Sequence, residues 1–286
     1  MKVRITKFDP STLKPHRILM FVGRRGVGKS VALEHIMSQL KVDYTMAMTP
    51  TEDSAEMFRK HIPSCGIFPT FNIAKIDSMV QMQRKMARTP NKLRSALLVL
   101  DDCMYEKKAF KHVSIRDIFM NGRHSKITLA LTSQYCLDLT PDLRGNCDYV
   151  FVFRDTVISN KQRLWKYFFG MFETYQDFSR VMDTCCEDYG CLVLDNTAKS
   201  NAVEHCVFWW KANPTMPHFR LGREVFWRMD QACRKTDADL IKEQQDRLRE
   251  QQVMELKKQK RCITYVERAD TEGRVVNEES PLVMKV

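Results

Sequence analysis

The chain has 286 residues, of which 44% are hydrophobic, so a sizeable core is available and global disorder is excluded. This length suits one large α/β domain or one domain with appendages. The formal net charge is +11, from 46 Lys and Arg against 35 Asp and Glu. Such an excess favours a polyanionic partner such as nucleic acid, although a basic surface also serves solubility alone.

The ten cysteines form no regular framework and no C-x-x-C pair, which disfavours both a disulfide scaffold and a zinc ribbon. The tightest cluster, Cys185-Cys186 with Cys191, His205 and Cys206, lacks the usual ligand spacing of zinc sites. We therefore predict core cysteines. The first fifteen residues have no apolar signal core, and no run approaches the length of a membrane span. We expect reduced thiols in a cytosolic compartment and no membrane span.

Residues 1–16 form a polar lead-in, with an edge strand expected around Val3 and Ile5. The apolar run at residues 18–22 predicts a buried strand. A complete G-x-x-x-x-G-K-[ST] motif follows at residues 23–30, and a helical pattern comes after it. Strand, glycine-rich loop and helix in this order predict a phosphate-binding loop. The nucleotide-binding residues that we predict are Gly23, Arg24, Arg25, Gly26, Val27, Gly28, Lys29, Ser30 and Val31.

The chemistry explains these residue types. Glycines let the backbone approach a polyphosphate closely, and successive N–H groups then converge on it with the positive end of the following helix. Lys29 is expected to contact the β- and γ-phosphates, and the Ser30 hydroxyl to be a ligand of Mg²⁺. A second strand is expected at residues 43–49, and an amphipathic core helix at residues 76–87.

The apolar run at residues 95–100 predicts a central parallel strand that ends in two acids, Asp101 and Asp102. Open α/β sheets bind ligands at this end of their strands. Asp101 is predicted to hold Mg²⁺ opposite Ser30, and Asp102 to orient or activate the attacking water. The alternative is an Asp pair that caps the next helix.

A helix is expected within residues 110–125, and a buried strand at residues 127–132 ends in Ser133-Gln134. Gln134 is predicted to sense the γ-phosphate or position water; a structural role in a loop is the alternative. Arg123 and Arg144 are candidates for an arginine that neutralises transition-state charge across a subunit boundary, although lone arginines are more often surface residues. One strand lies between the phosphate loop and the acid strand along the chain. This suits the P-loop class in which an extra strand, carrying a polar residue, separates the two in the sheet, a class that includes RecA-like motors.

Further strands are expected at residues 149–153, 191–195 and 206–210. Residues 160–183 are helical in pattern and rich in aromatics, which either stack bases or, as we favour, pack in a core. The predicted organisation is a P-loop domain at 1–212, a basic extension at 213–235, a charged helix at 236–262 and a flexible tail at 263–286. The fold class is α/β, with a mostly parallel central sheet flanked by helices.

Four stretches carry a family resemblance: FVGRRGVGKS, LLVLDDC, NGRHSKITLALTSQY and DLRGNCDYVFVFRD. In this order and spacing they resemble the genome-packaging ATPases of nucleocytoplasmic large DNA viruses, within the FtsK–HerA superfamily of P-loop motors. The resemblance covers about residues 15–212. The first two stretches are generic to P-loop enzymes, whereas the last two are more specific.

The resemblance implies a ring-forming translocase that uses Mg²⁺ and ATP to move double-stranded viral DNA into a preformed capsid. It implies nucleotide and metal binding by Lys29, Ser30 and Asp101, a catalytic acid at Asp102 and a polar sensor at Gln134. Arg123 is the first candidate for the inter-subunit arginine and Arg144 the second. Implied partners are DNA, further copies of the chain and a capsid or portal-like vertex protein, at the assembly site in the host cytoplasm or in the virion.

Two other functions remain open. One is a P-loop kinase of a small molecule, for which Glu52 and Asp53 after the second strand are candidate substrate acids. The other is a nucleotide-dependent scaffold that does not hydrolyse ATP and uses the C-terminal helix for interactions.

Overall fold

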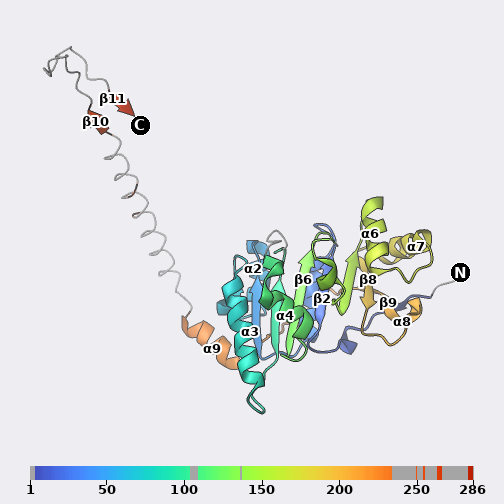
Figure 1. The fold of residues 1–286 in the computed structure, drawn as a ribbon, viewed down its shortest axis with the longest axis horizontal. Coiled ribbons are helices and arrows are strands. Elements are labelled where there is room, and N and C mark those ends of the chain that lie inside the picture. Colours follow the sequence, from blue (N-terminus) through green and yellow to red (C-terminus); the bar gives the residue numbers. More distant parts are fainter. Residues whose placement is uncertain are drawn as a thin grey trace. The chain divides into compact units, whose positions relative to one another are not determined.

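The computed structural model describes residues 4–103, 109–135 and 137–233, together with residues 249, 254, 263–265 and 283–285. They divide into two units, residues 1–230 and residues 231–286. In the first unit, a nine-stranded sheet has the order β1-β9-β8-β7-β2-β6-β5-β3-β4 (Figure 1). The strands are β1 (Thr6–Lys7), β2 (Ile18–Val22), β3 (Tyr44–Met48), β4 (Ile67–Phe68), β5 (Ala96–Leu100), β6 (Ile127–Ser133), β7 (Tyr149–Phe153), β8 (Gly190–Asp195) and β9 (Val207–Lys211).

The sheet is parallel except at one strand. Strand β8 pairs antiparallel with both β7 and β9, and every other pair of neighbours is parallel. The helices of this unit are α1 (Lys29–Gln39), α2 (Glu52–Arg59), α3 (Ile73–Ala87), α4 (Val113–Asn121), α5 (Pro141–Arg144), α6 (Ile158–Phe168), α7 (Tyr175–Cys185), α8 (Val203–Cys206) and the larger part of α9 (Glu224–Cys233), with short 3-10 turns at Pro10–Thr12, Ser64–Gly66 and Ala109–Lys111.

Helices cover both faces of the sheet, so its central strands are apolar on both sides. In β2, Ile18, Met20 and Val22 face one core, which includes residues of α3, α4, α6 and α7. Leu19 and Phe21 face the other core, which includes residues of α1 and α2. Burial on both faces explains why these strands read as continuous apolar runs rather than as alternating patterns. The predicted α/β fold with a mostly parallel sheet is confirmed.

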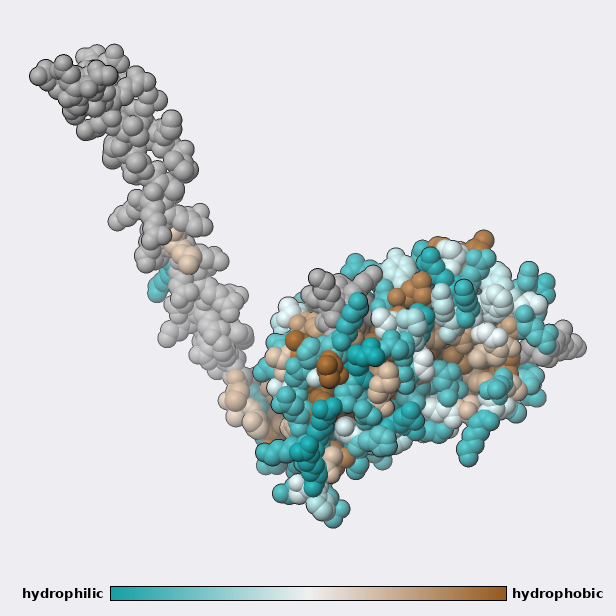
Figure 2. All heavy atoms as spheres, in the orientation of Figure 1, coloured by the Kyte–Doolittle hydropathy of each residue, from teal (hydrophilic) through white to brown (hydrophobic). Residues whose placement is uncertain are grey.

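The outer surface over α3 and α4 is largely hydrophilic, with apolar side chains scattered over it (Figure 2). Met82 of α3 and Val113 and Met120 of α4 are among the exposed ones. Single exposed apolar residues of this kind are ordinary on protein surfaces.

The predicted order of the central strands is confirmed. Strand β6 lies between β2, which precedes the phosphate loop, and β5, which ends at the acids. The aromatic stretch at residues 160–183 differs from the expectation because it forms two helices, α6 and α7. Helix α6 ends at Phe168, and the Thr174 hydroxyl accepts a hydrogen bond from the Asp177 backbone N–H to begin α7. Phe169 and Phe178 are fully buried, as the core interpretation of the aromatics predicts.

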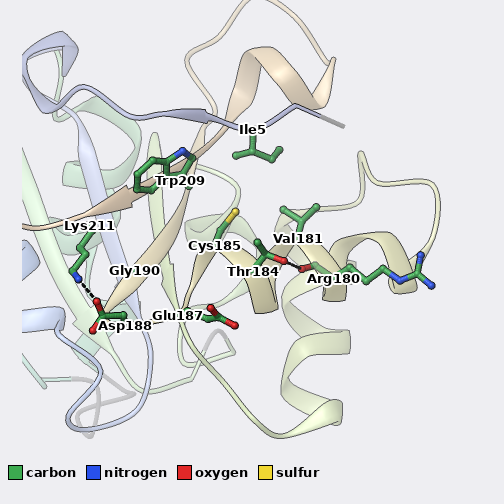
Figure 3. Close-up of a pocket in the computed structure, with 10 residues that line it drawn as sticks. All are labelled: Ile5, Arg180, Val181, Thr184, Cys185, Glu187, Asp188, Gly190, Trp209 and Lys211. Carbon is green, nitrogen blue, oxygen red and sulfur yellow. Dashed lines mark hydrogen bonds and ion pairs between the residues drawn. The ribbon is translucent and has the colours of Figure 1, made fainter. Parts of the chain in front are cut away.

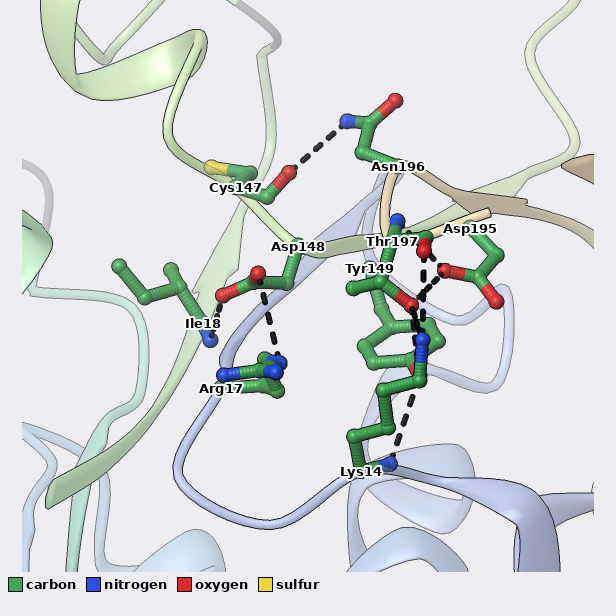
Figure 4. A network of polar contacts seen from close by, with 9 residues as sticks. All are labelled: Lys14, Arg17, Ile18, Cys147, Asp148, Tyr149, Asp195, Asn196 and Thr197. Carbon is green, nitrogen blue, oxygen red and sulfur yellow. Dashed lines mark hydrogen bonds and ion pairs between the residues drawn. The ribbon is translucent and has the colours of Figure 1, made fainter. Parts of the chain in front are cut away.

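A polar network closes the amino-end edge of the sheet, opposite the phosphate loop (Figure 4). One Asp148 carboxylate oxygen accepts a hydrogen bond from the Ile18 backbone N–H at 3.0 Å, and the other lies 3.6 Å from Arg17 Nε. The Asn196 side chain donates to the Cys147 carbonyl oxygen at 2.8 Å. These contacts tie the starts of β2 and β7 to the end of β8.

The first unit continues past residue 212 to Asp230. The Leu221 backbone N–H donates to the His61 carbonyl at 2.8 Å, and the Phe219 ring stacks on the His61 ring at 3.9 Å between centroids. Part of the expected basic extension therefore packs on the domain. In the second unit, β10 (Ile263–Tyr265) pairs antiparallel with β11 (Val283–Lys285). Most of the charged helix predicted at 236–262, and most of the predicted tail, lie outside the described residues.

Candidate nucleotide site

The loop between β2 and α1 has the backbone shape that a phosphate loop needs. Gly26 and Gly28 have φ angles of +76° and +97°, in the left-handed region that glycine enters without a Cβ clash. Gly28 immediately precedes α1 and accepts the Ala32 backbone N–H at 3.0 Å. The free N–H groups of the first turn of α1 therefore lie beside the loop, as an anion site requires.

Lys29 folds back over this loop. Its Nζ donates to the carbonyl oxygens of Gly23 at 2.6 Å and Arg24 at 2.8 Å. Burial lowers the pKa of Lys29, while the nearby Asp102 and Asp101 carboxylates oppose that change. Both acids thus lie close enough to Lys29 to act on its charge.

The acid that ends β5 is held by hydroxyl groups from both neighbouring strands. Asp101 is 6% exposed, and its two carboxylate oxygens accept from Thr132 Oγ1 at 2.8 Å and Thr49 Oγ1 at 3.2 Å. Thr132 is in β6, and Thr49 follows β3. Thr132 Oγ1 also accepts the backbone N–H of Asp102 at 2.9 Å. Asp102 has φ +51° and is less buried than Asp101.

A cavity of about 790 Å³ joins these parts. Its lining combines the phosphate loop, the start of α2, the two acids, and residues at the ends of β8 and β9. The lining residues are Arg24, Arg25, Gly26, Gly28, Lys29, Ser30, Val31, Thr51, Asp53, Ser54, Asp101, Asp102, Tyr189, Lys211, Ala212 and Pro214. The structure thus brings seven of the nine predicted loop residues together with both predicted acids; Gly23 and Val27 belong to the same loop.

The donor set fits Mg²⁺. The Ser30 hydroxyl and the Asp101 carboxylate are hard oxygen donors that line one cavity, and such donors suit this ion. The two threonine hydroxyls fix the orientation of the Asp101 carboxylate, which is how outer residues commonly hold a metal ligand in place.

Gln134 lies at the same edge of the sheet but outside this cavity. It follows β6 and lines a separate small pocket with Asp155, Asn160 and Arg163. Arg24 of the phosphate loop connects the two places, because its Nε lies 3.8 Å from an Asp155 carboxylate oxygen. That Asp155 side chain is also bonded to the first turn of α6.

Neither predicted arginine lies in the cavity of its own chain. Arg123 is exposed in the turn between α4 and β6, at the amino end of β6, whereas the phosphate loop lies at the carboxyl end of the sheet. Arg144 is 7% exposed, and its guanidinium lies 4.2 Å from the Tyr167 ring centroid. Exposure leaves Arg123 open to a neighbouring molecule, whereas Arg144 is engaged within its own chain.

The sequence analysis gave no site role to Thr49, Thr132, Tyr189 or Lys211, nor to four further residues that line the cavity: Thr51, Ser54, Ala212 and Pro214. Thr49 follows a strand, Thr132 lies within one, Lys211 ends one and Tyr189 immediately precedes one, so the place of each depends on pairing across the sheet. For Thr132, a polar residue near the carboxyl end of an apolar run was an available signal. Tyr189 offered none, because a bulky residue rarely adopts the left-handed backbone that it has here.

The cysteine prediction is consistent with the structure. Cys186, Cys191 and Cys206 are buried, and burial raises the thiol pKa of each. Among the residues that the structure describes, no cluster of three or more His, Cys, Asp or Glu side chains could hold a metal ion. Within the same residues, no helix combines the length and apolar character needed to cross a bilayer.

Comparison with solved structures identifies the fold. The genome packaging NTPase B204 of Sulfolobus turreted icosahedral virus 2, solved in complex with AMPPCP, matches with a TM-score of 0.50 and 16% sequence identity. The match covers 70% of this chain and 100% of that one. At this identity the likeness concerns the fold, which is that of a P-loop ATPase.

Sequence comparison identifies the relatives. The uncharacterized protein 088R of Invertebrate iridescent virus 3 is 33% identical over 210 residues, which cover 71% of this chain and 80% of 088R. The uncharacterized protein L437 of Acanthamoeba polyphaga mimivirus is 29% identical over 221 residues, covering 74% and 78% respectively. No protein-family model matches the sequence. The chain therefore belongs to the family of large DNA virus proteins that includes 088R, and its fold is that of the P-loop ATPases.

Proposed function

We propose that this chain is a Mg²⁺- and ATP-dependent motor that packages double-stranded viral DNA into the capsid. The observation that carries the proposal is the shared cavity, in which the phosphate loop faces Asp101 and Asp102. Membership of a family of large DNA virus proteins, and a fold shared with a viral genome packaging NTPase, support the same function.

Each residue has a distinct part in the proposed hydrolysis. The loop N–H groups and Lys29 bind the β- and γ-phosphates. Ser30 and Asp101 hold Mg²⁺, which neutralises phosphate charge when bound. The Asp102 carboxylate orients the attacking water and accepts its proton. Thr132 is a positioning residue, because its hydroxyl contacts Asp101 and the Asp102 backbone at once.

Gln134 and Arg123 complete the proposed motor. Gln134 senses the γ-phosphate, and the Arg24–Asp155 contact links its pocket to the phosphate loop. Arg123, exposed at the far end of the sheet, acts on the site of a neighbouring copy in a ring, with Arg144 as the second candidate. The net charge of +11 supports binding to DNA phosphates, which is independent of sequence and weakens steeply with salt.

ATP hydrolysis by the purified chain, with and without linear double-stranded DNA, tests this function. DNA is expected to stimulate the wild type, and Lys29→Ala to abolish hydrolysis. Asp102→Asn is expected to bind ATP but not turn it over. Mixing Arg123→Ala with wild-type subunits is expected to lower activity more than dilution does. An ATP hydrolysis rate that is the same with and without DNA at every salt concentration would overturn the motor function.

A kinase is the second candidate, and one observation favours it. Asp53, at the start of α2, lines the same cavity as the phosphate loop, where a substrate acid would be needed. Glu52 is less suited, because Arg59 Nη1 donates to its carboxylate at 2.5 Å. Two results together would favour the kinase. The wild type would transfer phosphate from ATP to a small-molecule acceptor, and Asp53→Asn would lose this transfer. Hydrolysis of ATP by the wild type would not respond to DNA.

A further inference from the structure

The turn that leads into β8 has a strained backbone. Asp188 and Tyr189 have φ angles of +47° and +63°, so two consecutive residues other than glycine lie in the left-handed region. A bulky residue adopts this conformation only when its surroundings impose it, and such strain gathers at ligand-binding sites.

Two contacts join this turn to its surroundings. The Gly190 backbone N–H donates to the Glu187 carbonyl at 2.8 Å and closes the turn. Lys211, the last residue of β9, forms an ion pair with Asp188 (Figure 3). Gly190 and Lys211 are also paired in the sheet, so the turn is fixed to both strands.

The strained turn places an aromatic ring over the phosphate loop. Tyr189 is 64% exposed and lines the nucleotide cavity. A Cβ atom added to Gly28 would lie 3.5 Å from both Cβ and Cδ1 of Tyr189, so the ring begins directly beside the loop. Ala212 and Pro214, which follow the neighbouring strand β9, also line the cavity. Apart from Lys211, this wall is apolar and aromatic, unlike the acidic wall formed by Asp101 and Asp102.

The sheet order puts these two walls on opposite sides of the loop. The phosphate loop follows β2; β5 with its acids lies two strands away in one direction, and β8 lies two strands away in the other. Because β8 runs antiparallel, its beginning lies at the edge where the parallel strands end. A nucleoside triphosphate whose γ-phosphate and Mg²⁺ lay at Asp101 would therefore extend its base towards Tyr189.

We propose that Tyr189 stacks on the nucleobase, with Ala212 and Pro214 beside it, and that this wall selects purine nucleoside triphosphates. The proposal rests on nucleotide binding by the phosphate loop, as in the proposed function. Stacking dominates here because the Lys211 ammonium is already paired with Asp188. Purines present a larger face to an aromatic ring than pyrimidines do, so stacking favours them.

Calorimetric titration with Mg²⁺ and either ATP or inorganic triphosphate, which lacks a base, separates the contributions. Tyr189→Asn removes the ring while keeping a residue that tolerates the left-handed backbone. ATP is expected to bind this variant roughly tenfold more weakly, the size of one lost base–aromatic stack. Triphosphate is expected to bind it as tightly as wild type, and Tyr189→Phe to bind both ligands normally.

Met229→Asn is the control, since Met229 in α9 is 55% exposed and is not among the residues that line the nucleotide cavity. Unchanged ATP affinity in Tyr189→Asn would overturn the stacking proposal. An equal loss of ATP and triphosphate affinity would also overturn it. That result would show that Tyr189 holds the phosphate loop in shape and does not contact the base. Wild-type protein that binds neither ligand would overturn nucleotide binding itself, a pattern distinct from both.

Discussion

Thr132 and Asp101 form the central contact of the acidic wall: the threonine hydroxyl donates to the carboxylate at 2.8 Å while accepting the next backbone N–H, that of Asp102, at 2.9 Å. One hydroxyl group thus fixes both the proposed metal ligand and the backbone that carries the proposed base. The contact crosses from β6 to the end of β5, so the pairing of these strands sets the geometry of the site.

Replacing Thr132 by valine keeps the shape of the side chain and removes the hydroxyl. Because the carboxylate loses a donor and the Asp102 N–H loses its acceptor, we expect ATP hydrolysis to fall roughly 10- to 100-fold, the usual effect of losing a residue that orients a metal ligand. Thr132→Ser should retain most activity. Thr128→Val, at a buried position in the same strand, is the matched control. Equal rates for the two valine variants would contradict the positioning role.

Removing the Asp148 carboxylate should destabilise the domain without altering nucleotide affinity. Asp148→Ala leaves the buried Ile18 N–H without its acceptor and removes the partner of Arg17, so we expect the free energy of unfolding to fall by about 2–3 kcal/mol. Asp148→Asn keeps an oxygen acceptor and should lose less. Urea denaturation measures both variants.

An exposed ion pair provides the comparison for that experiment. Arg116 and Asp142 lie 2.6 Å apart, but both side chains are open to solvent. Exposed pairs contribute little to stability, so Asp142→Ala should scarcely change the unfolding midpoint. If Asp142→Ala lowered the free energy of unfolding as much as Asp148→Ala, burial would not be the reason why the two carboxylates differ.

Stability should decline above pH 9 because of buried thiols. Burial raises the pKa of Cys186 from 9.0 to about 12. Between these values the unfolded chain loses a proton that the folded chain keeps, so folding weakens as the pH rises. One such thiol lowers the free energy of unfolding by about 1 kcal/mol at pH 10. Urea denaturation at pH 8 and pH 10 should show a smaller decline for Cys186→Ala than for wild type; parallel declines would refute the assignment.

The two candidate arginines should differ in their effect on stability. Arg144 is buried with its guanidinium over the Tyr167 ring, so Arg144→Ala should lower the free energy of unfolding by about 1–2 kcal/mol. Arg123 is exposed, and Arg123→Ala should change it by no more than about 0.5 kcal/mol. Thermal or urea unfolding of both variants and the wild type measures these changes. Similar destabilisation by both would remove the basis for testing Arg123 as the arginine of a neighbouring subunit.

The central sheet could be predicted because burial on both faces leaves continuous apolar runs. Strands β2, β5, β6 and β7 all carry this signal, and the structure confirms them. The edge strand expected around Val3 and Ile5 forms at Thr6–Lys7, whereas β4, at the other edge, was not predicted; each has two residues, too short for a periodic pattern. The break between α6 and α7 was missed because aromatic residues continue across it.

The candidate site divides in the same way. The loop residues follow one another in sequence, and so do the two acids. Each short stretch predicts its own chemistry from its residue types and spacing. Thr49, Thr132 and Lys211 reach the site through strand register, which the local sequence does not encode. Tyr189 opposes its own backbone preference, and only the fixed turn around it makes the conformation possible. Such conflicts between local preference and fold are where functional sites tend to lie.

The pairing of β1 with β9 has a consequence for synthesis. Thr6 and Lys7 pair with Phe208 and Trp209, and the Phe8 ring packs against Trp210. About two hundred residues separate these partners, and translation at roughly 5–20 residues per second takes at least ten seconds to supply the second one. During that interval β1 has no partner strand, and of the aromatic neighbours of Phe8 only Tyr149 and Phe151 of β7 are already made. Strand β1 is thus made about two hundred residues before its partner strand, and a chain that stops before residue 207 lacks that partner.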